Sequence, residues 1–219
     1  MNSVFSRREA LIAGASLLAA TTWTGSGLVL AQQTDETVIG TVTRIQSNGV
    51  AMQNAFPRIL EKGSEIMLGD VISTSKGARL EFTTLDGGIV TLGESTIFIV
   101  MEYVMSQSGG NIVMQLMEGA FLATSGTMNK LADNTFNVET PFATIGIRGT
   151  TVWGGTLSDT FEVALIDGMG VTVDTYGGRV ELDKVGQGTK IPNRKTPPSN
   201  PTVWGETKID KAKATVTFN

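Results

Sequence analysis

The chain has 219 residues, of which 41% are hydrophobic, 17% charged and 6% aromatic, and its formal net charge is −4. It contains no histidine and no cysteine, which excludes a Ser-His-Asp triad, a thiol nucleophile, a disulfide and metal sites built from those residues. The mildly acidic balance predicts a solvated surface and gives no electrostatic basis for binding nucleic acid.

The first 31 residues differ in composition from the rest. Arg7 and Arg8 precede an Ala- and Leu-rich apolar stretch that runs to Ala20, and the segment ends at Val29-Leu30-Ala31. A charged region, a short apolar region and small residues before a cleavage point are the parts of an export signal. We expect residues 1–31 to be a signal peptide cleaved after Ala31. A spanning helix wants about 20 apolar residues, more than this run offers, but an uncleaved membrane anchor remains the alternative.

The paired arginines resemble the twin-arginine translocation motif. Ser6 directly precedes Arg7 and Arg8, and Leu11 stands at the expected hydrophobic position, although Ala10 replaces the usual phenylalanine. The resemblance implies that the twin-arginine translocase is a partner during export and that the chain crosses the membrane folded. The expected location is therefore periplasmic or secreted, without a stable membrane span after cleavage.

Beyond residue 36, short runs of β-branched and alternating residues recur between glycine, asparagine and aspartate. The first two runs are Thr37–Ile45 and Val50–Gln53, and Asn48-Gly49 between them is a strong hairpin signal. Further runs are Glu65–Leu68, Val71–Thr74, Arg79–Thr83, Ile89–Leu92, Thr96–Val104, Ile112–Met117, Gly119–Thr124, Thr135–Glu139, Thr150–Trp153, Thr160–Ile166, Gly170–Thr175 and Arg179–Leu182. This spacing predicts an all-β fold, either solenoid-like or sandwich-like, with little helix outside the signal.

The last part of the chain breaks this pattern. Four of the six prolines lie between residues 191 and 201, which predicts an extended linker or edge and not a central strand. Terminal strands could follow at Thr202–Trp204 and Ala214–Phe218. The lysines between them are either solvated or placed to prevent pairing of another chain with an exposed sheet edge. The chain thus divides into a signal at 1–31, a β domain at 32–190, and a Pro-rich linker with C-terminal strands at 191–219.

A family resemblance spans residues 63–190. It is carried by the Gly69-Asp70 turn before a strand ending in Thr74, by Asp86-Gly87, by Thr140-Pro141-Phe142-Ala143 and by Arg148-Gly149-Thr150. These segments resemble the FecR domain. The resemblance implies a β-rich, solenoid-like module outside the cytoplasm, best known in regulators that cross the membrane once and control a sigma factor. Only nine residues precede the apolar run, so we do not expect sigma-factor control across the membrane here.

The family-motif positions are interpreted mainly as structural: Gly69, Asp70, Asp86, Gly87, Pro141, Arg148, Gly149 and Thr150. Glycines 69, 77, 87, 119, 149 and 168 are expected to hold turn conformations, and Pro141 is expected where its missing N–H does least harm. Arg148 has two interpretations. It either donates to strand-end carbonyls or to a carboxylate such as Glu139, or it contacts a ligand or partner.

The sequence shows few features of a catalytic or cofactor-binding site. No phosphate-binding loop, dinucleotide motif or calcium loop is present, so we expect no cofactor and no metal. The carboxylates of Asp159, Glu162, Asp167 and Asp174 could pair as glycosidase acids, although most such carboxylates do no chemistry. Trp153 and Trp204 could stack on a sugar, but one core and one edge tryptophan is the simpler interpretation.

These observations predict an exported, non-catalytic FecR-like module that binds, scaffolds or senses an unknown protein or glycan of the bacterial cell envelope. Two alternatives stay open. One is a periplasmic carbohydrate-active enzyme that uses paired carboxylates, and the other is a membrane-anchored signalling regulator.

Overall fold

More than half of the residues that the structure describes lie in β-strands. The structure is a computed structural model, and it describes residues 37–106, 109–127 and 133–219. Arg7, Arg8 and the expected cleavage point at Ala31 therefore lie outside the described residues. Sixteen strands form one sheet, and the only helix of the described ranges, α1 (Glu206–Ala214), follows the last strand. The prediction of an all-β fold with little helix is confirmed.

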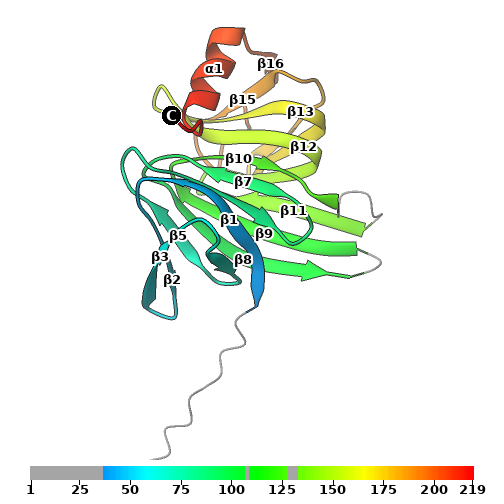
Figure 1. The fold of residues 1–219 in the computed structure, drawn as a ribbon. Helices are drawn as coiled ribbons and strands as arrows, with labels where there is room; N and C mark the ends of the chain where they lie inside the picture. The colour runs from blue at the N-terminus through cyan, green and yellow to red at the C-terminus, as the bar shows by residue number, and fades with distance from the viewer. Residues whose placement is uncertain (1–36, 107–108, 128–132) are drawn as a thin grey trace, which may run out of the picture. The chain divides into compact units, whose positions relative to one another are not determined.

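The sheet curls so that two halves pack face to face, which is the sandwich-like alternative (Figure 1). The half that we call the covered layer contains β4 (Glu65–Met67), β1 (Val38–Gln46), β6 (Arg79–Thr84), β7 (Ile89–Leu92), β10 (Ala120–Thr124), β15 (Gln187–Ile191) and β16 (Thr202–Val203). The other half, the open layer, contains β3 (Phe56–Leu60), β2 (Gly49–Gln53), β5 (Val71–Thr74), β8 (Ile97–Met105), β9 (Gly109–Glu118), β11 (Asp133–Glu139) and β14 (Gly178–Leu182).

Two long strands join the layers. The first residues of β12 (Thr144–Leu157) pair with β11 in the open layer, and its last residues pair with β10 in the covered layer. Its partner β13 (Thr160–Thr175) runs from the covered layer to the open layer. It pairs with β15 near its start and with β14 near its end. All pairings are antiparallel except the parallel pair of β9 and β11. The β12–β13 hairpin is therefore shared by both layers.

The core lies between the two layers. Phe98 of the open layer contacts Phe82 and Phe121 of the covered layer, with ring centroids 6.5 and 6.3 Å apart. All three rings are fully buried. Alternation explains this burial, because every second side chain of a strand points to the same face of its sheet.

A helix, α1, ends where the last terminal strand was predicted, and the residues after Ala214 form a turn and irregular structure. The prediction of a strand at Thr202–Trp204 is confirmed in β16 (Thr202–Val203), but the strand at Ala214–Phe218 is wrong. Ile209, Ala212 and Val216 pack on the outer face of the covered layer together with Trp153 and Trp204. Their spacing of three and four residues is helical. This spacing was the signal that the sequence interpretation missed.

Residues 192–201 of the Pro-rich segment follow β15 and lie outside the strands, and they pack against their neighbours. The guanidinium of Arg194 donates to the Thr140 carbonyl oxygen and, at 3.3 Å, to Thr144 Oγ1. The Tyr176 N–H donates to the Arg194 carbonyl oxygen at 2.8 Å. These contacts hold the segment against the β11–β12 and β13–β14 turns.

Within the described ranges, no helix combines the length and the apolar character needed to cross a membrane.

Candidate functional site

The Arg-Gly-Thr motif lies where the β12–β13 hairpin passes from one layer to the other. Gly149 has φ +61° and Gly168, on the facing strand, has φ +102°. A Cβ on Gly168 would lie 2.4 Å from the Gly149 carbonyl oxygen, so this crossing excludes any side chain there. All six glycines expected to adopt turn conformations have positive φ, although Gly149 and Gly168 lie within strands and not in turns. Strands that change layers commonly do so at such irregular positions.

Thr150 fastens this crossing. Its buried hydroxyl donates to the Asp167 carbonyl oxygen at 2.7 Å, which ties β12 to β13. Its N–H donates to Ser125 Oγ at 2.9 Å, and the Ser125 N–H donates back to the Thr150 carbonyl oxygen at 3.1 Å. Both hairpin strands are thereby fixed to the segment that follows β10. Arg148 lies two residues before Thr150 and so is adjacent to this hydrogen-bonded crossing.

A groove of about 520 Å³ lies beside Arg148 on the open layer. Its volume is within the roughly 300–1,000 Å³ typical of small-ligand sites. The side chains and backbone that line it come from β11, β12, β13, β14 and the residue after β14. They are Thr135, Phe136, Asn137, Gly146, Ile147, Arg148, Met169, Gly170, Val171, Thr172, Glu181, Leu182 and Asp183.

The Arg148 side chain is exposed in this groove and, among the described residues, makes no hydrogen bond and no ion pair. Glu139, the carboxylate suggested as its partner, stands opposite Thr144 at the turn end of the hairpin. Arg148 lies four positions further along β12 than Thr144, so the pair with Glu139 is not formed. The arrangement leaves a planar guanidinium, which matches carboxylates and phosphates, facing open space.

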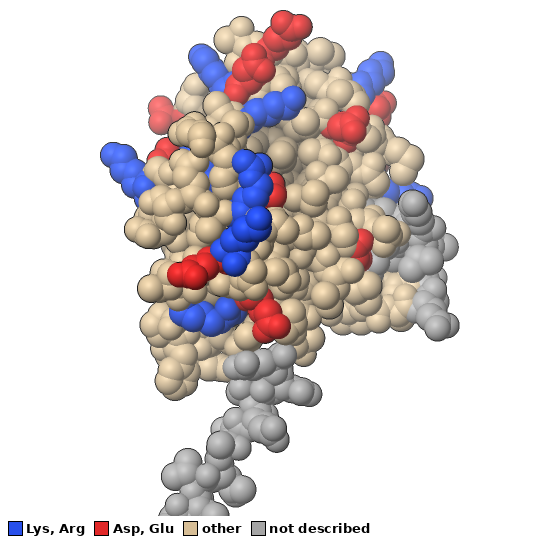
Figure 2. Space-filling model, viewed as in Figure 1, with Lys and Arg blue, Asp and Glu red and all other residues tan. Residues whose placement is uncertain are grey.

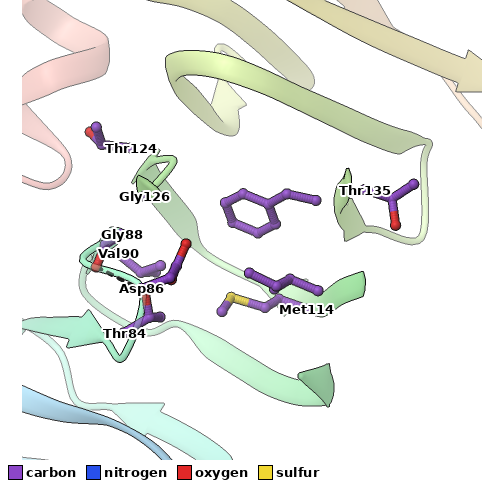
Figure 3. Close-up of a pocket in the computed structure, with 10 residues that line it drawn as sticks. Thr84, Asp86, Gly88, Val90, Met114, Thr124, Gly126 and Thr135 are labelled. Atoms are coloured by element: carbon purple, nitrogen blue, oxygen red, sulfur yellow. Dashed lines mark hydrogen bonds between the residues drawn. The ribbon is translucent and has the colours of Figure 1, made fainter. Parts of the chain in front are cut away.

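Asp86 is the centre of a second, much smaller pocket (Figure 3). Its carboxylate accepts hydrogen bonds from Thr84 Oγ1 at 2.6 Å and from the Tyr103 hydroxyl at 2.9 Å. The Tyr103 hydroxyl also accepts from the Asp86 N–H at 3.0 Å. Burial is the main cause that raises the pKa of Tyr103 to about 12. The pocket holds only about 10 Å³, which is room for one water molecule, so Asp86 and Gly87 form a structural turn here.

Asp70 and Pro141 also serve turns. The Asp70 carboxylate is fully buried, where it accepts the Met67 N–H at 2.7 Å and pairs with the guanidinium of Arg58. Gly69 beside it has φ +85°. Pro141 is exposed in the turn between β11 and β12, where no strand partner needs its N–H.

The carboxylates considered as glycosidase acids are spread along one hairpin. Glu162 is 2% exposed and pairs with Lys208 of α1, while Asp174 pairs with Arg179. At about 3.3 Å per strand residue, Glu162, Asp167 and Asp174 of β13 are spaced well beyond the roughly 5–10 Å that glycosidase carboxyls need. Asp159 lies in the β12–β13 turn with φ +66°. The described residues also contain no cluster of three carboxylates that could hold a metal ion.

Both tryptophans considered for sugar stacking are buried under α1. Trp153 is fully buried and Trp204 is 7% exposed, and their rings meet edge to face with centroids 6.1 Å apart. The Trp153 indole N–H donates to Thr215 Oγ1 at 3.0 Å. The core position of Trp153 matches the simpler interpretation, and Trp204 directly follows the edge strand β16, although α1 covers its ring.

Comparison with known proteins identifies part of the chain. Residues 70–169 match the family model described as FecR protein. Two crystal structures of a candidate anti-sigma factor from Parabacteroides distasonis ATCC 8503 are each 18% identical to this chain, with TM-scores of 0.49 and 0.48. Each alignment covers 63% of this chain but only 61% of the solved one. No curated protein matches the sequence. Residues 70–169 of this chain are therefore similar to the FecR protein family.

Proposed function

We propose that this chain is an exported, non-catalytic FecR-type module that binds a partner or ligand in the bacterial cell envelope and so takes part in regulation or sensing. The groove beside Arg148 carries this proposal. It is open, carries the charged side chains of Arg148, Glu181 and Asp183, and is large enough for a ligand, and seven of its thirteen lining residues belong to the segment that matches the FecR family. Export rests on the twin-arginine resemblance at Arg7 and Arg8.

The surface around the layers supports a binding role in which recognition is local. Figure 2 shows acidic and basic side chains interspersed on the face that it presents. With a formal net charge of only −4, long-range attraction of a strongly charged partner contributes little. Affinity would therefore come from particular groups such as the unpaired Arg148 guanidinium.

Export is tested by fractionating cells that produce the full chain. The expected result is a protein in the envelope or periplasmic fraction whose N-terminus is Gln32. Replacing both Arg7→Lys and Arg8→Lys keeps the charge and should leave the precursor inside the cell, whereas the control Arg44→Lys should be exported. Unchanged export of the double variant contradicts the twin-arginine route, and an intact N-terminus in the membrane fraction favours the anchored alternative.

Binding is tested by capture from envelope extract on immobilised protein. We expect a partner that the wild type and Lys190→Ala retain and that Arg148→Ala loses. Lys190 is a suitable control because it is an exposed cation on β15 of the covered layer. A partner retained equally by all three proteins would show that the groove is not the binding site.

A further inference from the structure

A glycine that the fold does not require keeps the groove open. Gly170 lies inside β13, and its φ is outside the left-handed region. A Cβ at this position would meet a single atom within 4 Å, the Leu182 carbonyl oxygen at 3.4 Å, which is an ordinary contact. Glycine weakens a strand interior and often marks a place where a ligand approaches the backbone. The absence of a side chain at Gly170 therefore keeps the groove open and is not required for packing of the sheet.

Gly146 differs from Gly170 in this respect. It lies in β12, and a Cβ there would come within 2.4 Å of Thr172 Oγ1. Thr172 is its register partner on β13, so packing alone explains this glycine. Gly170 is thus the position where the hollow can be filled without a clash.

Opposite charges flank Gly170. Arg148 of β12 is its register partner on one side. On the other side Val171 pairs with Leu182, which brings Asp183 beside Gly170. Both charged residues are exposed and line the groove, yet within the described residues they form no ion pair with each other. Since neighbouring strands are about 4.8 Å apart, the two backbone positions are roughly 10 Å apart, with the glycine between them.

This arrangement selects the charge pattern of a ligand. The Arg148 guanidinium suits a carboxylate, which it can bind through two parallel hydrogen bonds. Asp183 suits an ammonium group, and Glu181 on the same wall adds a second negative charge. These two carboxylates disfavour a ligand with several negative charges, such as a polyphosphate. The exposed Met169 offers an apolar surface for a side chain.

We infer that the groove binds a small zwitterion, a free amino acid or a short peptide, with its carboxylate on Arg148 and its ammonium group on Asp183. The inference rests on the proposed binding function and names the class of ligand. Thr172 and Asn137, which also line the groove, supply hydrogen-bonding groups for the ligand backbone.

The test is isothermal titration of the purified protein with alanine, dialanine, trialanine, N-acetyl-trialanine and trialanine amide. We expect at least one of the three zwitterions to bind and each blocked peptide to bind at least about tenfold more weakly, because each has lost one charged hydrogen-bonding end. Tighter binding of alanine indicates a free amino acid, and tighter binding of trialanine indicates a peptide. If none of the five binds, or if blocked and unblocked trialanine bind equally, the inference is wrong.

Two variants locate the binding. Gly170→Val fills the hollow and should abolish binding, while Arg148→Gln should remove the preference for a free carboxylate. Lys190→Ala is the control and should bind as the wild type does. Thermal unfolding of each protein shows whether it is folded, and Arg148→Gln decides the question should Gly170→Val unfold. Binding unchanged in both groove variants overturns the inference.

The two proposals can fail separately. If no zwitterion binds but Arg148→Ala still loses an envelope partner, then the ligand class is wrong and the binding function stands. If Arg148→Ala retains every envelope partner and Arg148→Gln binds each peptide as the wild type does, both proposals are overturned.

Discussion

The outer faces of the two layers differ in whether their charged side chains form ion pairs. On the covered layer, Glu162 is buried against the Lys208 ammonium group, which also lies 3.7 Å from the centre of the Trp204 ring. On the open layer, Arg148 and Asp183 are exposed and make no ion pair in the described part of the chain. The first face is closed by a helix, as Figure 1 shows, and the second carries the groove.

The same two strands build both faces, so the difference depends on position along the hairpin. Beyond the crossing at Gly149 and Gly168, β12 presents Trp153 to α1. Before the crossing, it presents Arg148 to the groove. One hairpin can therefore supply a structural face and a binding face, because the crossing lets each half pack against different neighbours.

The strongest test of the structural face is Trp153→Ala. Removing this fully buried side chain leaves a cavity under α1 and removes the indole N–H that donates to Thr215 Oγ1. We expect a loss of about 3–5 kcal/mol in the free energy of unfolding, measured by urea denaturation. Met169→Ala, at an exposed side chain of the groove, is the matched change on the open layer and should cost less than about 0.5 kcal/mol. Equal losses would contradict the distinction between the faces.

Lys208→Met should also destabilise the covered face. It leaves the buried Glu162 carboxylate without its cation, which we expect to cost about 2–4 kcal/mol. Lys211→Met is the control because Lys211 is exposed on the same helix. Adding Glu162→Met to Lys208→Met should recover much of the loss in urea denaturation. No recovery would mean that the helix depends on the lysine stem and not on the ion pair.

Two glycines two residues apart sharpen the boundary between the faces. Gly168→Ala should cost about 1–3 kcal/mol, because φ is +102° and the new Cβ would meet the Gly149 carbonyl oxygen. Gly170→Ala should be neutral or should stabilise by about 0.4–1 kcal/mol, since the fold accepts the Cβ. Thermal unfolding distinguishes them. A destabilised Gly170→Ala variant would show that packing of the sheet requires glycine at this position.

Tyr103 tests the core between the faces through pH. Its pKa is about 12 in the folded chain and about 10 when unfolded, so the unfolded chain ionises first. The stabilisation is complete below pH 10 and is lost as pH rises toward 12. Between pH 9 and pH 11, the wild type should lose about 1 kcal/mol more than Tyr103→Phe in urea denaturation. Parallel losses in the two proteins would contradict this role.

The smallest effect is expected at the binding face. Arg148→Ala removes an exposed side chain without a described partner, so the free energy of unfolding should change by less than about 0.5 kcal/mol. Circular dichroism during thermal unfolding measures it. A large loss would favour the structural interpretation of Arg148 over the contact with a ligand.

Local patterns in the sequence were enough for most of the strands and turns. Alternation and the Gly-Asp and Asp-Gly signals located strands such as β5 and β6, and the glycines of those turns have positive φ. Strand β3 was missed because Pro57 argues against a strand, although an edge strand such as β3 tolerates it. The groove was not predicted, since it depends on register: Gly170 is opposite Arg148 only once β12 and β13 are paired.

The sequence by itself determined the chemistry that is excluded and the all-β character, because residue types and the two-residue alternation are local properties. It also singled out Arg148 as a residue with two possible roles. Only the tertiary structure decided which residues Arg148 faces and which face α1 covers. Those outcomes depend on strand register and on the packing of segments far apart in the chain, such as Glu162 and Lys208, and no local pattern specifies them.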